Sequence, residues 1–337
     1  MTTSTKILVL GASGYVGARL IPSLLEKGFS VRAAGRSLKT LQGRPWADDP
    51  RLELFPVDVL GQESLTKACA GCVSAYYLIH SMNTGYRDFA DADRKAARNM
   101  ADAAYANGIK RIIYLGGLGD TQTTLSLHLR SRMEVSQILH SGRVPATTLR
   151  AAMIIGTGGA AYEILSYMVR RLPVMITPVW VSTESQPISI RNVLGYLVGC
   201  LEHDQTANQV YDIGGVDILS YRRLMDIYAE EARLAKRWII PLPILTPRLN
   251  AYWAGLVTPV PVSIIRPLAE GLRNRLVCRD NRIRSIISQE LLDCRQAIRL
   301  TLKPHAAACE ESSGVKTYAP PECQYPGDPP WVGGYRR

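Results

Sequence analysis

Three glycines near the start of the chain constrain its fold more than any other feature. Gly11, Gly14 and Gly17 follow the apolar run 6–10 and open a segment, 15–27, whose apolar residues have helical spacing. In such a strand–turn–helix unit the first glycine permits a tight turn, the second lets a ligand approach the backbone, and the third lets the helix pack closely on the strand. The unpaired N–H groups of the helix start favour an anion. The pattern predicts a dinucleotide site, with an ordinary glycine turn as the alternative.

The residues after the second expected strand, 30–34, indicate which dinucleotide fits. An acidic residue there would bind a ribose 2′-hydroxyl, but the chain has Arg36 and Ser37. Arg36 can pair with a 2′-phosphate and Ser37 can donate a hydrogen bond to it, while Arg32 and Lys39 add positive charge. NADP is therefore the predicted cofactor, and NAD is the less favoured alternative.

The expected cofactor contacts extend over the ends of four strands. Asp58 follows the run 52–57 and is expected at the adenine edge, with a turn or helix cap as its alternative role. His80 follows the run 75–79 and is expected near the nicotinamide, with a loop histidine as the alternative. The predicted cofactor-binding residues are Gly11, Ser13, Gly14, Tyr15, Val16, Gly17, Arg36, Ser37, Asp58, Val59, Ile79, His80 and Ser81.

Strand-like and helix-like segments alternate along the chain. Expected strands or extended segments are 6–10, 30–34, 52–57, 75–79, 111–115, 146–150, 174–182 and 210–213. Expected helices are 15–27, 88–107, 127–140, 161–171, 193–202 and 221–235. This alternation predicts an α/β fold, a doubly wound parallel Rossmann sheet with helices on both faces. Within one domain, 1–302, residues of about 156–190 and 216–302 are expected to form a smaller C-terminal substrate lobe, and 303–337 a Pro/Gly-rich irregular tail.

Several segments resemble the short-chain dehydrogenase/reductase superfamily. They are the glycine turn, 58–59, 76–82 (Tyr-Tyr-Leu-Ile-His-Ser-Met) and 111–119 (Arg-Ile-Ile-Tyr-Leu-Gly-Gly-Leu-Gly). Three more are similar to bacterial proteins of its atypical, NmrA-like and epimerase-like branch: 128–132, 186–191 and 258–261. The resemblance covers about residues 5–300. It implies a Rossmann fold and an NAD(P) cofactor, and it leaves the substrate open.

The catalytic residues typical of that family are absent from their places. A typical member has Tyr-x-x-x-Lys on one helix face and a serine after the fifth strand, but no tyrosine of this chain has a lysine four residues on. His128 stands at the tyrosine's place, Arg132 at the lysine's, and 116–117 (Gly-Gly) at the serine's. His128 and Arg132 are candidate catalytic residues, with Tyr114 as a second candidate acid. Arg132 would keep His128 neutral near pH 7. Alternatively, both pack around the bound nucleotide.

The predicted function is that of an NADP(H)-dependent oxidoreductase or isomerase acting on a small, mostly apolar carbonyl-type substrate. The alternative is a non-catalytic NADP-binding sensor or scaffold protein. Residues 153–156, after the sixth expected strand, are expected to line the nicotinamide site. Further residues expected to shape the substrate pocket are Tyr162, Trp180, Gln186 and Arg191, and a core or surface role is the alternative for each residue of both sets.

Composition narrows the partners and the compartment. The net charge of +11 is spread along the chain, and it suits an anionic ligand or simply a solvated surface. With three phenylalanines no base-stacking platform is expected, and thus no nucleic-acid partner. Seven cysteines, an odd number, and no signal peptide fit a cytoplasmic protein with reduced thiols. Cys69 and Cys72 are expected in the core, and no metal site is expected.

One uncharged stretch, 249–265, is a candidate for contact with a membrane. It is short for a membrane span and is broken by Pro259 and Pro261. We do not expect it to cross a bilayer. A peripheral membrane contact or a protein partner remains open at this point, and so does the oligomeric state.

Overall fold

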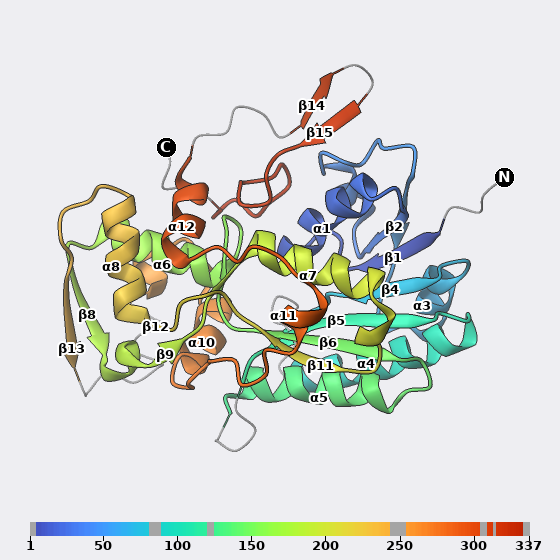
Figure 1. The fold of residues 1–337 in the computed structure, drawn as a ribbon, viewed down its shortest axis with the longest axis horizontal. Helices are drawn as coiled ribbons and strands as arrows, with labels where there is room; N and C mark the ends of the chain where they lie inside the picture. Colours follow the sequence, from blue (N-terminus) through green and yellow to red (C-terminus); the bar gives the residue numbers. More distant parts are fainter. Residues whose placement is uncertain are drawn as a thin grey trace.

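Seven apolar runs pair into one parallel sheet in the computed structural model, which describes residues 5–80, 89–119, 125–242, 254–303, 309–312 and 315–332 (Figure 1). The strand order is β11-β6-β5-β4-β1-β2-β3, and every neighbouring pair is parallel. The strands are β1 (Lys6–Leu10), β2 (Ser30–Gly35), β3 (Leu52–Pro56), β4 (Ser74–Tyr77), β5 (Arg111–Gly117), β6 (Ala146–Ala151) and β11 (Val210–Ile213). The predicted Rossmann sheet is confirmed. Its order reverses between β1 and β4, where such sheets bind ligands at their carboxyl edge.

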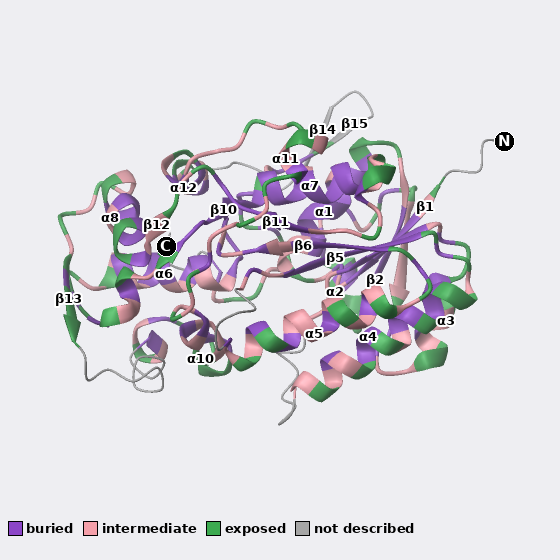
Figure 2. Cartoon of the chain, turned by 60° about the horizontal axis from the view of Figure 1, so that its bottom comes forward, coloured by how far each residue is buried: buried purple, intermediate pink, exposed green. Residues whose placement is uncertain are grey.

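Helices cover both faces of the sheet. In β1, Ile7 and Val9 are buried toward one face, and Leu8 and Leu10 toward the other. Burial on both faces explains why the strands are continuous apolar runs. Figure 1 shows α1 (Tyr15–Glu26) and α7 (Ile190–Glu202) above the sheet, and Figure 2 shows its buried strands between the helix layers. The other face is covered by α3 (Gln62–Cys69), α4 (Phe89–Ala106) and α5 (Leu127–Ser141).

Helix α1 contains a proline without breaking. Pro22 has no N–H, so it leaves the carbonyl of Ala18 without its usual helical donor. The indole nitrogen of Trp46, a fully buried side chain just beyond α2 (Leu38–Gln42), donates to that oxygen at 2.9 Å. Because the orphaned carbonyl is satisfied, the helix continues through Pro22 to Glu26.

The segments that precede and follow β11 in the sequence build a lobe with its own apolar core. Rings of Tyr162 and Tyr228 lie edge to face in this core, 6.1 Å apart. The further elements of the described chain are β7 (Ile154–Ile155), α6 (Ala160–Arg171), β8 (Val174–Pro178), η2 (Val179–Ser182), β9 (Glu184–Ser185), β10 (Ile188–Ser189), η3 (Asp204–Thr206), β12 (Leu219–Ser220), α8 (Tyr221–Glu231), β13 (Trp238–Leu242), α10 (Val262–Gly271), α11 (Ile283–Ile286) and α12 (Cys294–Leu302).

Three boundaries in this part differ from the sequence prediction. The segment 174–182 is extended only through Pro178 and then turns as a 3₁₀ helix. Helix α7 begins at Ile190, three residues early, because the Ser189 hydroxyl accepts from the backbone of Arg191 and caps it. Helix α8 ends at Glu231, and Arg233 just beyond it has a left-handed backbone, φ 54°.

The described part of the uncharged stretch 249–265 is largely packed inside the lobe. Ala254, Val260 and the α10 residues Ile264 and Ile265 form a buried cluster against α6, whereas Leu256 is 79% exposed. The first five residues of the stretch lie outside the described residues. Among the residues that the structure describes, no helix combines the length and the apolar character needed to span a bilayer.

The tail returns to the first helix of the sheet. After α12, strands β14 (Cys309–Ser312) and β15 (Val315–Tyr318) pair as an antiparallel hairpin, which the sequence prediction lacked. Residues 319–332, here named the strap, then run against α1 without regular structure. Arg19 on α1 is fully buried beneath the strap and donates to the carbonyl of Pro321 at 2.9 Å.

Candidate functional site

The glycine turn has the geometry that its spacing predicts. Gly11 has φ 84°, and a Cβ there would lie 2.7 Å from the carbonyl oxygen of Leu78. A Cβ on Gly17 would overlap the carbonyl oxygen of Gly11, so only glycine lets α1 pack this closely on the turn. Gly14 is the N-cap residue of α1, and its N–H donates to the carbonyl of Gly11 at 2.9 Å. The role of Gly14 toward a bound diphosphate stays a prediction.

A cavity of about 460 Å³ lies over this turn at the carboxyl ends of the strands. Its volume is in the range of small-molecule and cofactor sites. Most of the predicted cofactor residues line it: Gly11, Ser13, Gly14, Tyr15, Val16, Gly17, Arg36, Asp58, Val59, Ile79 and His80. Ser37 is not in the lining, and Ser81 lies outside the described residues. The structure therefore brings together residues that are up to 69 positions apart (80 − 11).

At the expected adenine end, Arg36 is exposed and turns toward the cavity. Ser37 caps α2 instead, accepting from the backbone of Thr40 at 3.2 Å. Asp58 accepts from the backbone of Leu60 at 3.0 Å, which is its turn role, and it also lines the cavity, so its contact with the adenine stays a prediction. The prediction that Arg32 adds charge here is wrong. Its guanidinium is buried and donates to the carbonyl of Ala68 at 2.7 Å.

At the expected nicotinamide end, two histidines meet. The rings of His80, after β4, and His128, on α5, stack with centroids 4.8 Å apart and planes 28° apart. Both ring nitrogens of His80 and Nδ1 of His128 are shielded from solvent and have no hydrogen-bond partner among the described residues. Arg132 lines the cavity and donates to the carbonyl of Ile79 at 3.1 Å.

The histidine pair is electrically neutral at physiological pH. Burial, with the positive charge of Arg132 adding to it, lowers the pKa of His128 to about 3. Burial, Arg132 and His128 together lower the pKa of His80 well below its usual value. A neutral imidazole keeps one N–H donor and one acceptor nitrogen. The pair therefore suits a ligand group that accepts or donates a hydrogen bond, while it disfavours a cation.

Tyr114 is not positioned as a second acid. Its side chain is fully buried beneath α5 and is absent from the cavity lining. The hydroxyl donates to the carbonyl of Arg132 at 3.2 Å, and burial raises its pKa. The glycines at the serine's place also have a packing reason, since a Cβ on Gly117 would lie 2.9 Å from the side chain of Leu129.

The other residues expected at the nicotinamide site or the substrate pocket do not line the cavity, and most of them pack within the lobe. Tyr162 is buried and bonds Thr301, and Gln186 donates to the carbonyl of Gly215 at 2.8 Å. Met153 lies in the lobe core, and Trp180 belongs to η2. Arg191 pairs with Glu322 of the strap at 2.7 Å.

The two cysteines with redox spacing lie in the core, as the sequence predicts. Cys69 and Cys72 are buried thiols, and burial raises the pKa of Cys69 to about 12. Within the described part of the chain, no cluster of three or more His, Cys, Asp or Glu side chains could hold a metal ion.

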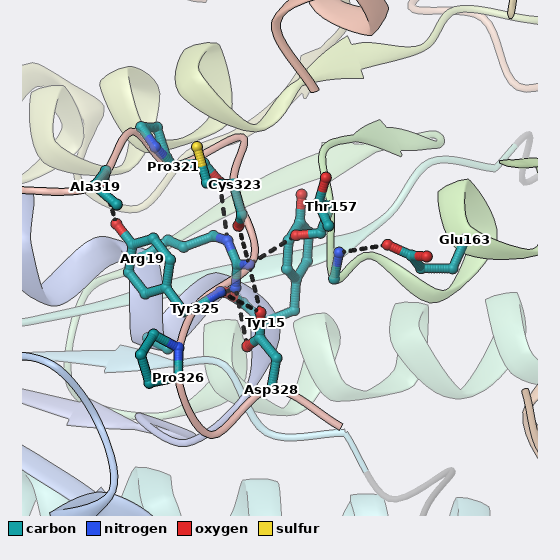
Figure 3. A network of polar contacts seen from close by, with 12 residues as sticks. Tyr15, Arg19, Thr157, Glu163, Ala319, Pro321, Cys323, Tyr325, Pro326 and Asp328 are labelled. Atoms are coloured by element: carbon teal, nitrogen blue, oxygen red, sulfur yellow. Dashed lines mark hydrogen bonds and ion pairs between the residues drawn. The ribbon is translucent and has the colours of Figure 1, made fainter. Parts of the chain in front are cut away.

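The strap supplies cavity residues that the sequence prediction missed. Asp328, Pro329 and Trp331 all line the cavity, as does Ile264 of α10. Figure 3 shows the guanidinium of Arg19 between Asp328 and the carbonyls of Thr157 and Cys323. One signal in the sequence pointed to this contact: Arg19 stands between Ala18 and Leu20 on α1, and a buried arginine needs a carboxylate or carbonyl partners.

The described residues fit a nicotinamide dinucleotide. The glycine turn leaves room for backbone to approach a diphosphate, Arg36 offers an exposed cation, and His80 offers unpaired ring nitrogens. Such a group would be held by the turn at its diphosphate and by the β2 end at its adenosine.

Sequence comparison agrees with this site. Residues 11–166 match the model of a family described as NAD(P)H-binding. The chain is 25% identical over 250 residues to "NADH dehydrogenase [ubiquinone] 1 alpha subcomplex subunit 9, mitochondrial" of Arabidopsis thaliana, covering 70% of this chain and 60% of that protein. The chain spans 60% or less of the length of this and the other first curated relatives it matches.

Solved structures share the fold. An NADPH-dependent quinone oxidoreductase of Escherichia coli, complexed with NADPH, gives a TM-score of 0.70 at 17% identity. A triphenylmethane reductase of Citrobacter sp., complexed with NADP(H), gives 0.69 at 18% identity. Each comparison covers 88% of this chain and 100% of the other chain.

Proposed function

We propose that the chain is an NADPH-dependent reductase of the short-chain dehydrogenase/reductase superfamily. The match of residues 11–166 to an NAD(P)H-binding family model, and the fold shared with a quinone oxidoreductase and a triphenylmethane reductase, support this proposal. Its proposed substrate is a small, mostly apolar carbonyl-type compound. The observation that carries the proposal is the stacked pair of His80 and His128, neutral and with unpaired ring nitrogens, beside the dinucleotide cavity.

The choice of the phosphorylated coenzyme rests on the end of β2. Arg36 is exposed there and lines the cavity, and no carboxylate occupies the neighbouring positions 35–37. A guanidinium pairs well with a phosphate group. The complexes of both structural neighbours with the phosphorylated coenzyme are consistent with this choice.

The histidines act in the proposed reaction as neutral hydrogen-bond donors. When bound, NADPH supplies a hydride. An N–H of His80 donates to the substrate oxygen, and His128 keeps that ring in place by stacking on it. The charge of Arg132 stabilises the oxygen as it becomes negative, and water supplies the proton that completes the alcohol. Leu115, Ile264 and Trp331 give the cavity an apolar wall that suits an apolar substrate.

This proposal is tested by NADPH oxidation over a panel of quinones, enones and aldehydes. We expect turnover of at least one compound, and a roughly 10²–10⁴-fold loss of kcat in His80→Ala, the range for a positioned acid–base or donor group. The matched control is His140→Ala, because His140 lies on the same helix as His128 but outside the cavity lining, where its ring bonds Thr148 at 3.1 Å. Binding of NADPH without turnover of any compound would contradict the reductase.

A non-catalytic NADPH-binding subunit is the second candidate. It is favoured by the missing Tyr-x-x-x-Lys pair, by Gly116 and Gly117 at the serine's place, and by the relative that is named as a subunit of NADH dehydrogenase. It predicts coenzyme binding with no hydride transfer and a protein partner that co-purifies with the chain. A cytoplasmic location and a peripheral membrane contact remain sequence predictions.

A further inference from the structure

One buried carboxylate of the strap, that of Asp328, meets two arginines of the sheet domain. Oδ2 of Asp328 lies 2.7 Å from Arg19, and Oδ1 lies 2.8 Å from Arg44. The three side chains are 2%, 0% and 1% exposed. The backbone of Tyr325 also donates to Asp328 at 2.9 Å, so both carboxylate oxygens are used. A charge triad this far from water depends on every member, since removing one leaves the others uncompensated.

The two arginines also bind backbone carbonyls of the loops around the cavity. Arg44 donates through its other nitrogen to the carbonyl of Ser13, inside the glycine turn. Arg19 donates to the carbonyl of Tyr15 at 3.1 Å and to that of Thr157 at 2.7 Å, as Figure 3 shows for Thr157. Both cations that pair with Asp328 therefore also bind backbone carbonyls of the loops beside the cavity.

We propose that Asp328 is a positioning residue for the coenzyme diphosphate. By holding Arg44 against Ser13, it keeps the glycine turn in the conformation that receives the diphosphate. The strap also closes the site, because Pro329 and Trp331 stand next to Asp328 in the cavity lining. This inference rests on the coenzyme binding of the proposed function and is independent of hydride transfer.

A second buried carboxylate of the strap, that of Glu322, provides a control that distinguishes positioning of the glycine turn from general stability of the strap. Glu322 is 1% exposed and pairs with Arg191 of α7 at 2.7 Å. Neither Glu322 nor Arg191 lines the cavity. Loss of this pair should loosen the strap without touching the glycine turn, so Glu322→Gln is the matched control for Asp328→Asn.

The experiment is a fluorescence titration of the full chain with NADPH, together with the melting temperature of each variant. We expect Asp328→Asn to weaken NADPH binding at least tenfold, and Glu322→Gln to change it less than threefold even if both lower the melting temperature. Arg44→Lys is a second variant for the case that Asp328→Asn does not fold, because a single ammonium cannot span Asp328 and Ser13. It should also weaken binding at least tenfold.

Competing fragments identify the part of the coenzyme that is affected. Asp328→Asn should weaken ADP, which carries the diphosphate, and leave 2′-AMP, which carries only the 2′-phosphate, within threefold. Equal effects of Asp328→Asn and Glu322→Gln on NADPH would overturn the inference, and so would tighter binding in Asp328→Asn, which would mark the strap as an obstruction. If the wild-type chain fails to bind NADPH, the proposed function itself fails.

Discussion

At the scale of a single residue, Arg36 is the proposed determinant of coenzyme choice. It is exposed at the end of β2, and no ion pair or hydrogen bond to its side chain is present among the described residues. Arg36→Glu should lose about 1–3 kcal/mol of NADPH binding, roughly five- to 150-fold, because a charge-assisted contact is replaced by repulsion. Titration with NADPH and NADH measures the change. Lys110→Glu is the control, because Lys110 is exposed just before β5, at the sheet edge opposite the cavity. An unchanged NADPH affinity in Arg36→Glu would show that the 2′-phosphate lies elsewhere.

The histidine pair makes folding stability depend on pH. His128 has its pKa lowered from 6.5 to about 3, so below pH 6.5 the unfolded chain binds a proton that the folded chain does not. Stability should be complete above pH 6.5 and fall toward pH 3, with a slope that approaches about 1.4 kcal/mol per pH unit for this one group. The lowered pKa of His80 acts in the same direction.

Urea unfolding between pH 7 and 5 measures this dependence. The double variant His80→Gln and His128→Gln removes both titrating rings and should flatten the curve relative to wild type. A wild-type curve that is already flat over this interval would contradict the neutral, buried pair.

At the scale of an element, the unit from β1 to α1 tolerates no side chain at Gly17. Gly17→Ala should destabilise the fold by about 1–3 kcal/mol, the cost of overpacking, and weaken NADPH binding because α1 must shift from the turn. Chemical denaturation and coenzyme titration measure the two effects. Gly61→Ala is the control, because Gly61 caps α3 with φ −99° and its added Cβ would meet only ordinary contacts, the nearest at 3.5 Å.

The elements of the sheet were predictable because their signals are local. A strand such as β1 is buried on both faces, so its sequence is a short apolar run, and the glycines that follow have a steric reason visible in their spacing. The start of α7 could be placed only with Ser189 recognised as its cap.

The site was less predictable because its decisive contacts join distant positions. His80 and His128 are 48 positions apart (128 − 80), and nothing near either residue in the sequence indicates that their rings stack. Asp328 meets Arg19 across 309 positions, inside a segment whose prolines and glycines predict only irregular structure. The prediction for Arg32 was wrong because side chains along β2 point alternately to the two faces of the sheet. Arg32 points to the face covered by α3, where carbonyls at the end of that helix accept its hydrogen bonds.

At the scale of the whole molecule, sheet and lobe should unfold together. The cavity is lined by the glycine turn, by Ala160 and Ile264 of the lobe, and by Trp331 of the strap. A coenzyme bound to all three parts stabilises them jointly, by about 2.7 kcal/mol at a concentration one hundred times its dissociation constant. Calorimetry should record one transition that moves upward by a few degrees with NADPH. Two transitions, of which only one responds to NADPH, would contradict this coupling.

The distance along the chain between Asp328 and its two arginines has a consequence for biosynthesis. Translation delivers the amino-terminal part first, and Asp328 follows Arg19 by 309 residues and Arg44 by 284. Until that aspartate emerges from the ribosome, neither arginine has this carboxylate partner, and the glycine turn is held by backbone contacts such as that of Gly11 with Ala34. A polypeptide that stops short of residue 328 therefore never acquires the finished ligand cavity, even if its central sheet has already formed.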